Sequence, residues 1–460
     1  MKTNKIKFAG LILLLSLACL LPGQGHAESR QVRIGIQAGA QSGALDSDGT
    51  MQCRDASGRV LFTGRHADVE YAAGSLLVNG QPGTLAMTFE SRSPIRWNGK
   101  PYRGNISLVT KGGGFNVVNT LDVESYLRGV LKIEVNPAWP MEALKAQAII
   151  ARTYALRQLG RHGKDGFDLC STTHCQAYRG MAAEDARLDR AISETRGIVV
   201  LYGGQLAQTY YFADGAGWTA DVSTVWGGGV PYLSCKPEPV QYNTPHTTWK
   251  AVITQESMQK IMNTLKSPIG TVLSVRALQR DGGSRVTMLE IRGTSGTARV
   301  KGHSFRMAAG SNLIRSTLFE IAAGEAGIQD VSSFTPTQPP VPATTRGSED
   351  VLITLTRQGA FSSTELMDML LHPEKREDYI KMALSRGGNQ SAPLQPVPAN
   401  PVPTVRPSSM APANFTFQGR GWGHGVGLSQ WGAKALSENG WNYVAILNHY
   451  FTGTTAKAIY

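Results

Sequence analysis

The chain has 460 residues, with 46 Lys and Arg against 34 Asp and Glu, a formal charge of +12, and a hydrophobic fraction of 41%. The length predicts about two to four domains, each large enough to bury a core. The apolar content and the lack of a three-residue period among the 51 glycines exclude a disordered or collagen-like chain, and the charged fraction of 17% disfavours long coiled coils.

Residues 1–27 are predicted to be a secretory signal peptide. Three lysines precede an apolar stretch at 8–21, and Gly25-His26-Ala27 fits the small-x-small rule of signal peptidase. The stretch is shorter than the roughly 20 residues that span a bilayer, which argues against an anchor; lipid attachment at Cys19 is a further alternative. We expect secretion across the inner membrane into the periplasm or cell wall, where anionic polymers rather than nucleic acid would meet the basic surface.

Residues 28–120 are predicted to be a β-rich N-terminal part. Short β-type runs alternate with turn signals, as at Val32–Ile36, at Ser75–Val78 followed by Asn79-Gly80, and at Asn116–Val118. This spacing is typical of an antiparallel sheet.

Residues 121–323 are predicted to form the core that carries the chemistry. Asp122 is placed to cap a helix whose apolar stripe runs from Val123 to Leu131 and reaches Glu134. A second helix is expected from Pro140 to Leu159, with many buried alanines. Strand-like runs return between 197 and 319, namely 198–201, 209–212, 286–291 and 298–300.

Residues 324–413 are predicted to be an insertion, and 414–460 to complete the core. Segments 333–344 and 391–414 hold eleven of the 23 prolines and flank a polar helical segment at 363–386. The tail begins with a glycine-dense loop at 419–427, followed by a helix that Ser429 caps and a last helix from Asn442. The predicted fold class is therefore α+β: antiparallel and β-rich, with a few helices forming the catalytic region and Pro-rich linkers around a helical insertion.

Glu134 is the first candidate for chemistry, because it occupies a position where the helical period asks for an apolar residue. Burial and the negative end of a helix dipole both favour the protonated form of a carboxyl group. Such a group suits general acid catalysis. The alternative is a structural carboxylate that turns outward or pairs with an Arg such as Arg152.

His162, Cys170, His174 and Cys175 form a second candidate site. Two thiolates and two imidazoles make a sound tetrahedral zinc set, although their spacing is not that of a standard finger. Disulfides are the competing interpretation, because Cys53 and Cys235 bring the secreted chain to four cysteines, with three possible pairings.

The glycine-dense loop and one tryptophan are candidates for ligand contact. The loop lacks a G-x-G-x-x-G pattern and a P-loop lysine, which excludes nucleotide binding of those kinds. Trp422, His424 and Gln430 are its available side chains, unless the loop is purely structural. Trp226, before Gly227-Gly228, suits sugar stacking, unless it is a core residue.

Together these pieces resemble the stage II sporulation protein D and LytB amidase-enhancer family. The resemblance covers about 117–460 apart from the insertion. The motifs that carry it, in the family's order, are Leu121–Leu131 with Glu134, Pro137–Ala148 with Ala151–Ala155, His174–Gly180, Val225–Gly228, Gly302–Arg306 and Gly419–Gly432.

The resemblance implies lytic transglycosylation of peptidoglycan glycan strands, preferably strands already stripped of stem peptides, with Glu134 as catalytic acid. It implies a glycan-lining role for Arg152, Gln176, Tyr178, Trp226, His424 and Gln430. It implies no required cofactor, but zinc beside the acid in some relatives makes the set of His162, Cys170, His174 and Cys175 an equal alternative to a disulfide.

Two departures from the family pattern leave a second function open. Gly215-Ala216-Gly217 stands where the family has Ser-Gly-Gly, and the stretch 324–413 interrupts the core. The resemblance to the LytB members of the family implies a protein that binds peptidoglycan without cleaving it and enhances an N-acetylmuramoyl-L-alanine amidase. Either function fits cell division, sporulation or wall turnover.

Overall fold

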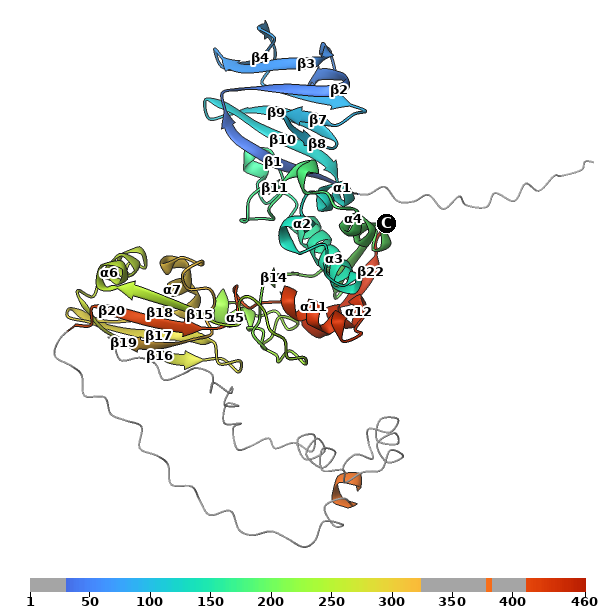
Figure 1. Ribbon diagram of the computed structural model, residues 1–460. Helices are drawn as coiled ribbons and strands as arrows, with labels where there is room; N and C mark the ends of the chain where they lie inside the picture. Colours follow the sequence, from blue (N-terminus) through green and yellow to red (C-terminus); the bar gives the residue numbers. More distant parts are fainter. Residues whose placement is uncertain (1–29, 324–377, 383–410) are drawn as a thin grey trace, which may run out of the picture. The chain divides into compact units, whose positions relative to one another are not determined.

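The computed structural model describes residues 30–323, 378–382 and 411–460 (Figure 1). The predicted signal peptide, and the predicted insertion apart from 378–382 and 411–413, lie outside the described residues. The chain divides into two compact units. Unit 1 contains residues up to Thr209 with 440–449 and 453–460, and unit 2 contains 210–439 with 450–452. The boundary at Thr209 therefore falls inside the segment 121–323 that the sequence presents as one core.

Unit 1 begins with an 11-stranded, mostly antiparallel sheet, seen in the blue and cyan part of Figure 1. Its order is β11-β1-β10-β9-β6-β2-β3-β4-β5, and β7 pairs with β2 and β8. Its strands are β1 (Gln31–Ala40), β2 (Ser42–Asp55), β3 (Val60–Ala72), β4 (Ser75–Val78), β5 (Gln81–Pro82), β6 (Ala86–Ser91), β7 (Ile95–Trp97), β8 (Lys100–Tyr102), β9 (Asn105–Lys111), β10 (Gly114–Asp122) and β11 (Leu169–Cys170).

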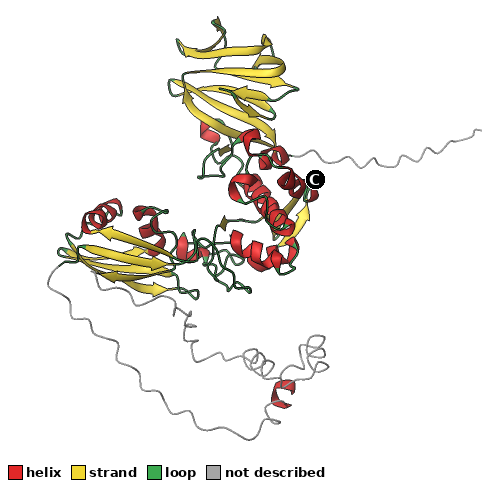
Figure 2. Cartoon of the chain, in the orientation of Figure 1, coloured by secondary structure: helices red, strands yellow, loops and turns green. Residues whose placement is uncertain are grey.

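Helices follow the sheet in unit 1, as the red segments of Figure 2 show. They are α1 (Val123–Arg128), α2 (Leu131–Glu134), α3 (Met141–Arg157) and α4 (Ala186–Glu194), with 3₁₀ turns at Gly163–Asp165 and Gly180–Ala183. A small sheet, in the order β13-β12-β22, joins β12 (Ile198–Tyr202) and β13 (Gln205–Leu206) to the C-terminal strand β22 (Thr455–Ala458).

Unit 2 is built around two three-stranded antiparallel sheets that share one apolar core. One has the order β15-β20-β19, with β15 (Trp249–Thr254), β20 (Asn414–Gly419) and β19 (Phe319–Ala323). The other has the order β16-β17-β18, with β16 (Val272–Arg280), β17 (Val286–Gly293) and β18 (Gly296–Lys301). The core includes Trp249, Phe319 and Phe417. Strand β20, although distant in sequence, is thus the centre of its sheet.

The remaining elements of unit 2 are short. They are β14 (Tyr211–Phe212), which pairs in parallel with β21 (Leu428–Ser429), and the helices α5 (Val222–Val225), α6 (Gln255–Thr264), α7 (Gly302–Ala309) and α11 (Gln430–Glu438). Helix α12 (Tyr443–Tyr450) begins in unit 1. Among the described residues, no helix is both long and apolar enough to cross a membrane.

The structure confirms the α+β class and most of the predicted elements. Asp122 caps α1 by accepting from the backbone N–H groups of Glu124 and Ser125, and Ser429 caps α11. The prediction of one continuous helix as far as Glu134 is wrong, because the chain breaks between α1 and α2. At the break, a Cβ on Gly129 would lie 2.3 Å from the ring of Tyr178, so only glycine permits this close packing.

Candidate functional site

Glu134 is the last residue of α2 and is half-buried in unit 1. The fully buried ring of Tyr126 lies close enough for the charge of Glu134 to contribute, after burial, to raising the pKa of the Tyr126 phenol. Tyr126 Oη donates to Gln176 Oε1 at 3.1 Å. The break at Gly129 therefore leaves Glu134 at the end of a separate short helix, where its charge acts on the buried phenol of Tyr126.

Gln176 and Tyr178 lie buried against Tyr126 rather than on an open surface. They are 1% and 3% exposed. The Tyr178 ring lies 5.3 Å from that of Tyr126, and its hydroxyl donates to Asn119 Oδ1 at 2.7 Å. The predicted glycan-lining role thus does not match their burial, and their contacts make them supports for Tyr126.

Arg152 is fully buried, at 0% exposed, and pairs with Glu124 instead of Glu134. Its Nε and Nη2 donate to the Glu124 carboxylate at 2.9 and 2.7 Å, and Nη1 donates to the carbonyl of Ile198 at 3.0 Å. Tyr460 Oη also donates to Glu124. Arg152 therefore joins α3 to α1 and to β12, and the interpretation that it lines a groove is corrected to a structural role.

The structure gathers His162, Cys170, His174 and Cys175, whose ligand atoms all lie within 4.8 Å of one another. Cys175 Sγ lies 3.5 Å from His162 Nε2 and 3.7 Å from His174 Nδ1, and Cys170 Sγ lies 3.6 Å from His174 Nδ1. Tetrahedral zinc with S and N ligands requires separations of about 3.3 to 3.8 Å between ligand atoms. All four described cysteines, including Cys53 and Cys235, are free thiols in the structure.

The two thiols of the cluster differ electrostatically. Burial raises the pKa of the Cys170 thiol, but hydrogen bonds with Thr172 and His174 outweigh burial and lower it to about 7. Burial raises the pKa of Cys175 to about 11. The charges of Cys175 and Glu134 both contribute to raising the pKa of the Tyr126 phenol. Tyr126 is thus a common neighbour of the carboxyl group and the Cys/His cluster.

One contact in the cluster opposes metal binding as it stands. The guanidinium of Arg161 lies 3.2 Å from His174 Nε2. An Arg can only donate, so Nε2 must accept and the proton of neutral His174 must sit on Nδ1, the atom that faces both sulfurs. Metal binding through Nδ1 would therefore require Arg161, which is exposed, to turn away.

Trp226, in unit 2, presents an exposed indole that other rings hold in place. It is 43% exposed, and its ring centre lies 4.8 Å from Tyr210, 4.9 Å from His424 and 5.9 Å from His303. Its Nε1 donates to His303 Nε2 at 3.2 Å. An exposed aromatic ring with a satisfied N–H group is suited to stacking against a flat apolar face such as that of a sugar.

His424 and Gln430 are more enclosed than Trp226. Burial lowers the pKa of His424 to about 3, and its Nδ1 accepts from the backbone N–H of Val426 at 3.1 Å. Gln430, the first residue of α11, is 7% exposed, and its Nε2 has no hydrogen-bond partner among the described residues. The loop at 419–427 therefore uses His424 to support Trp226.

Residues 111–202 match the family model described as Stage II sporulation protein, SpoIID. These residues are therefore similar to a SpoIID domain, and for this similarity we call 111–202 the SpoIID domain. An uncharacterized protein of Brachyspira hyodysenteriae is 38% identical over 148 residues, which are 32% of this chain and 40% of that protein. The amidase enhancer of Bacillus subtilis is 26% identical over 331 residues, 72% of this chain and 40% of that protein. Stage II sporulation protein D of Bacillus subtilis is 26% identical over 160 residues, which are 31% of this chain and 47% of that protein.

The SpoIID domain contains Glu134, its supports and the whole Cys/His cluster. Trp226, His424 and Gln430 lie outside it, in unit 2. The alignment covers 40% of the length of each of the first two relatives. The names of two of these relatives refer to the enhancement of an amidase and to sporulation.

The structure gives a reason for the departure at Gly215. A Cβ at Gly215 would lie 2.6 Å from Glu238 Oε2, and that buried carboxylate accepts from Tyr242 at 2.5 Å and Tyr450 at 2.7 Å. A serine there would displace this network. A side chain at this position is thus compatible only with a shift of the Glu238 carboxylate.

His303 is a functional candidate that the sequence motif contained but did not single out. Burial lowers its pKa to about 4, so it is neutral near pH 7 and its Nε2 can accept from Trp226. In the sequence, the only sign of this role is that a histidine occurs within the motif Gly302–Arg306. Its relation to Trp226, 77 positions away in the chain, required the fold.

The expectation of sugar stacking on Trp226 predicts that His303→Ala, which would loosen the indole, weakens binding of denuded glycan strands about 3- to 10-fold, as for a lost hydrogen bond and ring contact. His303→Gln should restore much of the affinity, because its amide oxygen can accept from Trp226. Isothermal titration of strands into proteins that also carry Glu134→Gln, which prevents cleavage, would measure the affinities of both variants. Equal weakening by Ala and Gln would show that the effect is not transmitted through this hydrogen bond.

Proposed function

We propose that the chain is a peptidoglycan lytic transglycosylase. Glu134 donates its proton to the glycosidic oxygen that leaves C1 of N-acetylmuramic acid, and the C1–O bond breaks. The muramyl C6 hydroxyl attacks C1, the new C6–O–C1 link forms, and the hydroxyl proton passes to the Glu134 carboxylate. The products are a 1,6-anhydromuramyl end and a free 4-hydroxyl, so no water is consumed. Because the nucleophile is part of the substrate, one carboxyl group suffices.

The environment of Glu134 is the observation that carries this proposal. The carboxyl group is half-buried at the end of α2, where water is partly excluded, and its charge acts on the buried phenol of Tyr126. Such surroundings favour the neutral acid. Gln176 and Tyr178 hold this phenol in place.

The substrate we propose is a glycan strand that amidases have stripped of stem peptides. Each muramic acid of such a strand keeps a lactyl carboxylate, which complements the excess of 46 Lys and Arg over 34 Asp and Glu. Trp226 supplies a stacking surface. We further propose that the protein acts outside the cytoplasm, next to an N-acetylmuramoyl-L-alanine amidase that prepares the substrate.

The Cys/His cluster suits zinc as a structural ion. Cys170, Cys175, His162 and His174 supply a two-sulfur, two-nitrogen set, and Asp165 Oδ2 lies 3.5 Å from His162 Nδ1, where it can orient the ring. Zinc in such a closed site would stabilise both sulfurs as thiolates. The chain's own contribution is to hold 162–175 in place, and with it Gln176, which accepts from Tyr126.

Metal analysis after reduction and dialysis should find about one zinc per chain. Cys170→Ser with Cys175→Ser should remove the zinc and lower the melting temperature, because the ion no longer links the side chains of the cluster. Cys53→Ser and Cys235→Ser are matched controls that should keep the zinc. A peptide map that shows Cys170 joined to Cys175 would rule the metal out.

A non-catalytic amidase enhancer is the second candidate function. The relative named amidase enhancer aligns over 72% of this chain, and Gly215 lacks the family's serine. Such a protein would bind strands and stimulate an amidase without making anhydro ends. The intact acid position at Glu134 favours the enzyme.

The deciding experiment is digestion of purified denuded strands, with the products analysed by mass spectrometry. Transglycosylation leaves ends 18 Da lighter than those of hydrolysis, since no water is added. We expect anhydromuramyl ends. Reducing ends would indicate a hydrolase, and unaltered strands that bind the protein and stimulate an amidase would establish the enhancer.

A further inference from the structure

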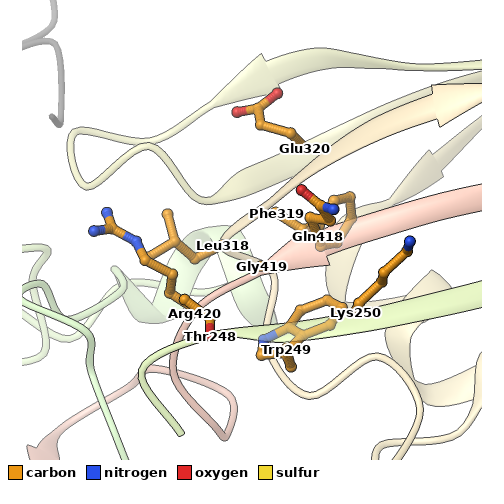
Figure 3. A pocket seen from close by; sticks show the side chains of 9 residues that line it. All are labelled: Thr248, Trp249, Lys250, Leu318, Phe319, Glu320, Gln418, Gly419 and Arg420. Atoms are coloured by element: carbon orange, nitrogen blue, oxygen red, sulfur yellow. The ribbon is translucent and has the colours of Figure 1, made fainter. Parts of the chain in front are cut away.

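Unit 2 contains a cavity of about 300 Å³ at one end of the sheet β15-β20-β19, outside the SpoIID domain. Each of the three strands contributes consecutive residues, which Figure 3 shows together. The lining residues are Thr248, Trp249, Lys250, Leu318, Phe319, Glu320, Gln418, Gly419 and Arg420. Small-molecule sites begin at about this size, so the cavity suits one sugar ring better than a long segment of strand.

The register of the sheet explains why the cavity is polar on one side. Lys250, Gln418 and Glu320 stand opposite one another across the three strands. The neighbouring row of Trp249, Gly419 and Phe319 belongs to the core side, where both aromatic rings are buried. Because side chains alternate along a strand, the polar row lies on the opposite face of the sheet. The buried aromatic residues thus hold the sheet in place from its core side, and the polar residues lie on its other face.

Gln418 is the first feature that points to a ligand. Its Oε1 is buried and has no hydrogen-bond partner among the described residues. A buried acceptor without a donor costs about 1 to 3 kcal/mol. A hydroxyl or amide N–H of a bound molecule would supply the missing donor.

The charges around Gln418 are the second feature. Glu320 is already neutralised, because its carboxylate accepts from Arg280 Nη2 at 2.7 Å. Lys250 is exposed and forms no ion pair within the described part of the chain. Arg420, half-buried directly after the end of β20, adds a second positive charge. The charged ends spread away from the centre in Figure 3, which leaves Gln418 between two cations.

We propose that this cavity binds a carboxylate-bearing N-acetyl sugar, with Gln418 accepting from its amide N–H and Lys250 meeting its carboxylate. Leu318 and the aliphatic stem of Lys250 contact the apolar face of the ring. N-acetylmuramic acid in a glycan strand has all three groups. The proposal rests on the proposed function for this choice of sugar, and it adds a strand-holding subsite in unit 2.

The test compares two tetrasaccharides by isothermal titration in the Glu134→Gln background, which prevents cleavage. One is a muramyl tetrasaccharide with lactyl carboxylates, and the other is chitotetraose, which lacks them. We expect the muramyl ligand to bind at least 5-fold more tightly. Lys250→Ala should reduce this preference to less than 2-fold, while the matched control Lys260→Ala, an exposed lysine on α6, should not change it.

Gln418→Leu gives a second, independent readout. It should weaken both ligands about 3- to 10-fold, because both carry acetamido groups, and it should leave the melting temperature unchanged or higher, because it removes an unmatched acceptor. A preference that survives Lys250→Ala, or equal affinities for both sugars at the start, would overturn the proposal.

The outcome is separable from that of the proposed function. If Lys250 and Gln418 control binding but the wild type makes no anhydro ends, the cavity stands and the enzyme proposal falls. If anhydro ends form and neither variant changes binding, the enzyme stands and the cavity proposal falls.

Discussion

Glu134→Gln should abolish nearly all production of anhydromuramyl ends, with a loss of about 10²- to 10⁴-fold relative to wild type. The amide keeps the size of the side chain, but it cannot donate a proton to the leaving oxygen or accept one from the C6 hydroxyl. Rates of product formation from denuded strands, measured by mass spectrometry, would give the ratio directly.

Two controls separate chemistry from folding in this experiment. Glu134→Gln should bind strands as tightly as wild type, because the substitution removes no packing contact. Glu142→Gln, an acid in the first turn of α3, should cleave at the wild-type rate. If Glu134→Gln retained more than a tenth of the activity, the assignment of Glu134 as the acid would be wrong.

The sequence predicted the elements whose signals are local. Asp122 reads as a cap from its position alone, because capping depends on a side chain and the next three residues. The strands with alternating burial, such as β4 and β18, were recognisable for the same reason. The break between α1 and α2 could not be predicted, because it depends on Tyr178, which reaches Gly129 only in the folded chain.

The site was predicted unevenly for a similar reason. The Cys/His cluster could be named because its members lie within 14 positions, and the structure brings all four together. The residue types of Arg152, Gln176 and Tyr178 suggested contact with substrate, but burial decides that role and burial is a property of the fold. The pairing of Trp226 with His303 joins α5's C-terminal neighbour to α7 and has no local signal at all.

The pair of Arg152 and Glu124 leads to the largest expected effect on stability. Arg152→Met should destabilise unit 1 by about 3 to 5 kcal/mol, because it leaves the Glu124 carboxylate buried without its cation. Replacing both partners, as in Arg152→Met with Glu124→Leu, should recover much of this loss, since no uncompensated charge remains. Urea unfolding of the three proteins would measure the differences.

The burial of the pair makes this outcome specific to a structural role. Arg152 also donates to the carbonyls of Ile198 and Ile192, and Glu124 also accepts from Gly197 N–H at 3.2 Å. These contacts hold α3 and α4 against β12, and β12 pairs with the C-terminal strand β22. A residue that served only to bind glycan would show the reverse pattern, with unchanged stability, weaker strand binding and no recovery in the double variant. The double cycle therefore distinguishes a support of the SpoIID domain from a contact with substrate.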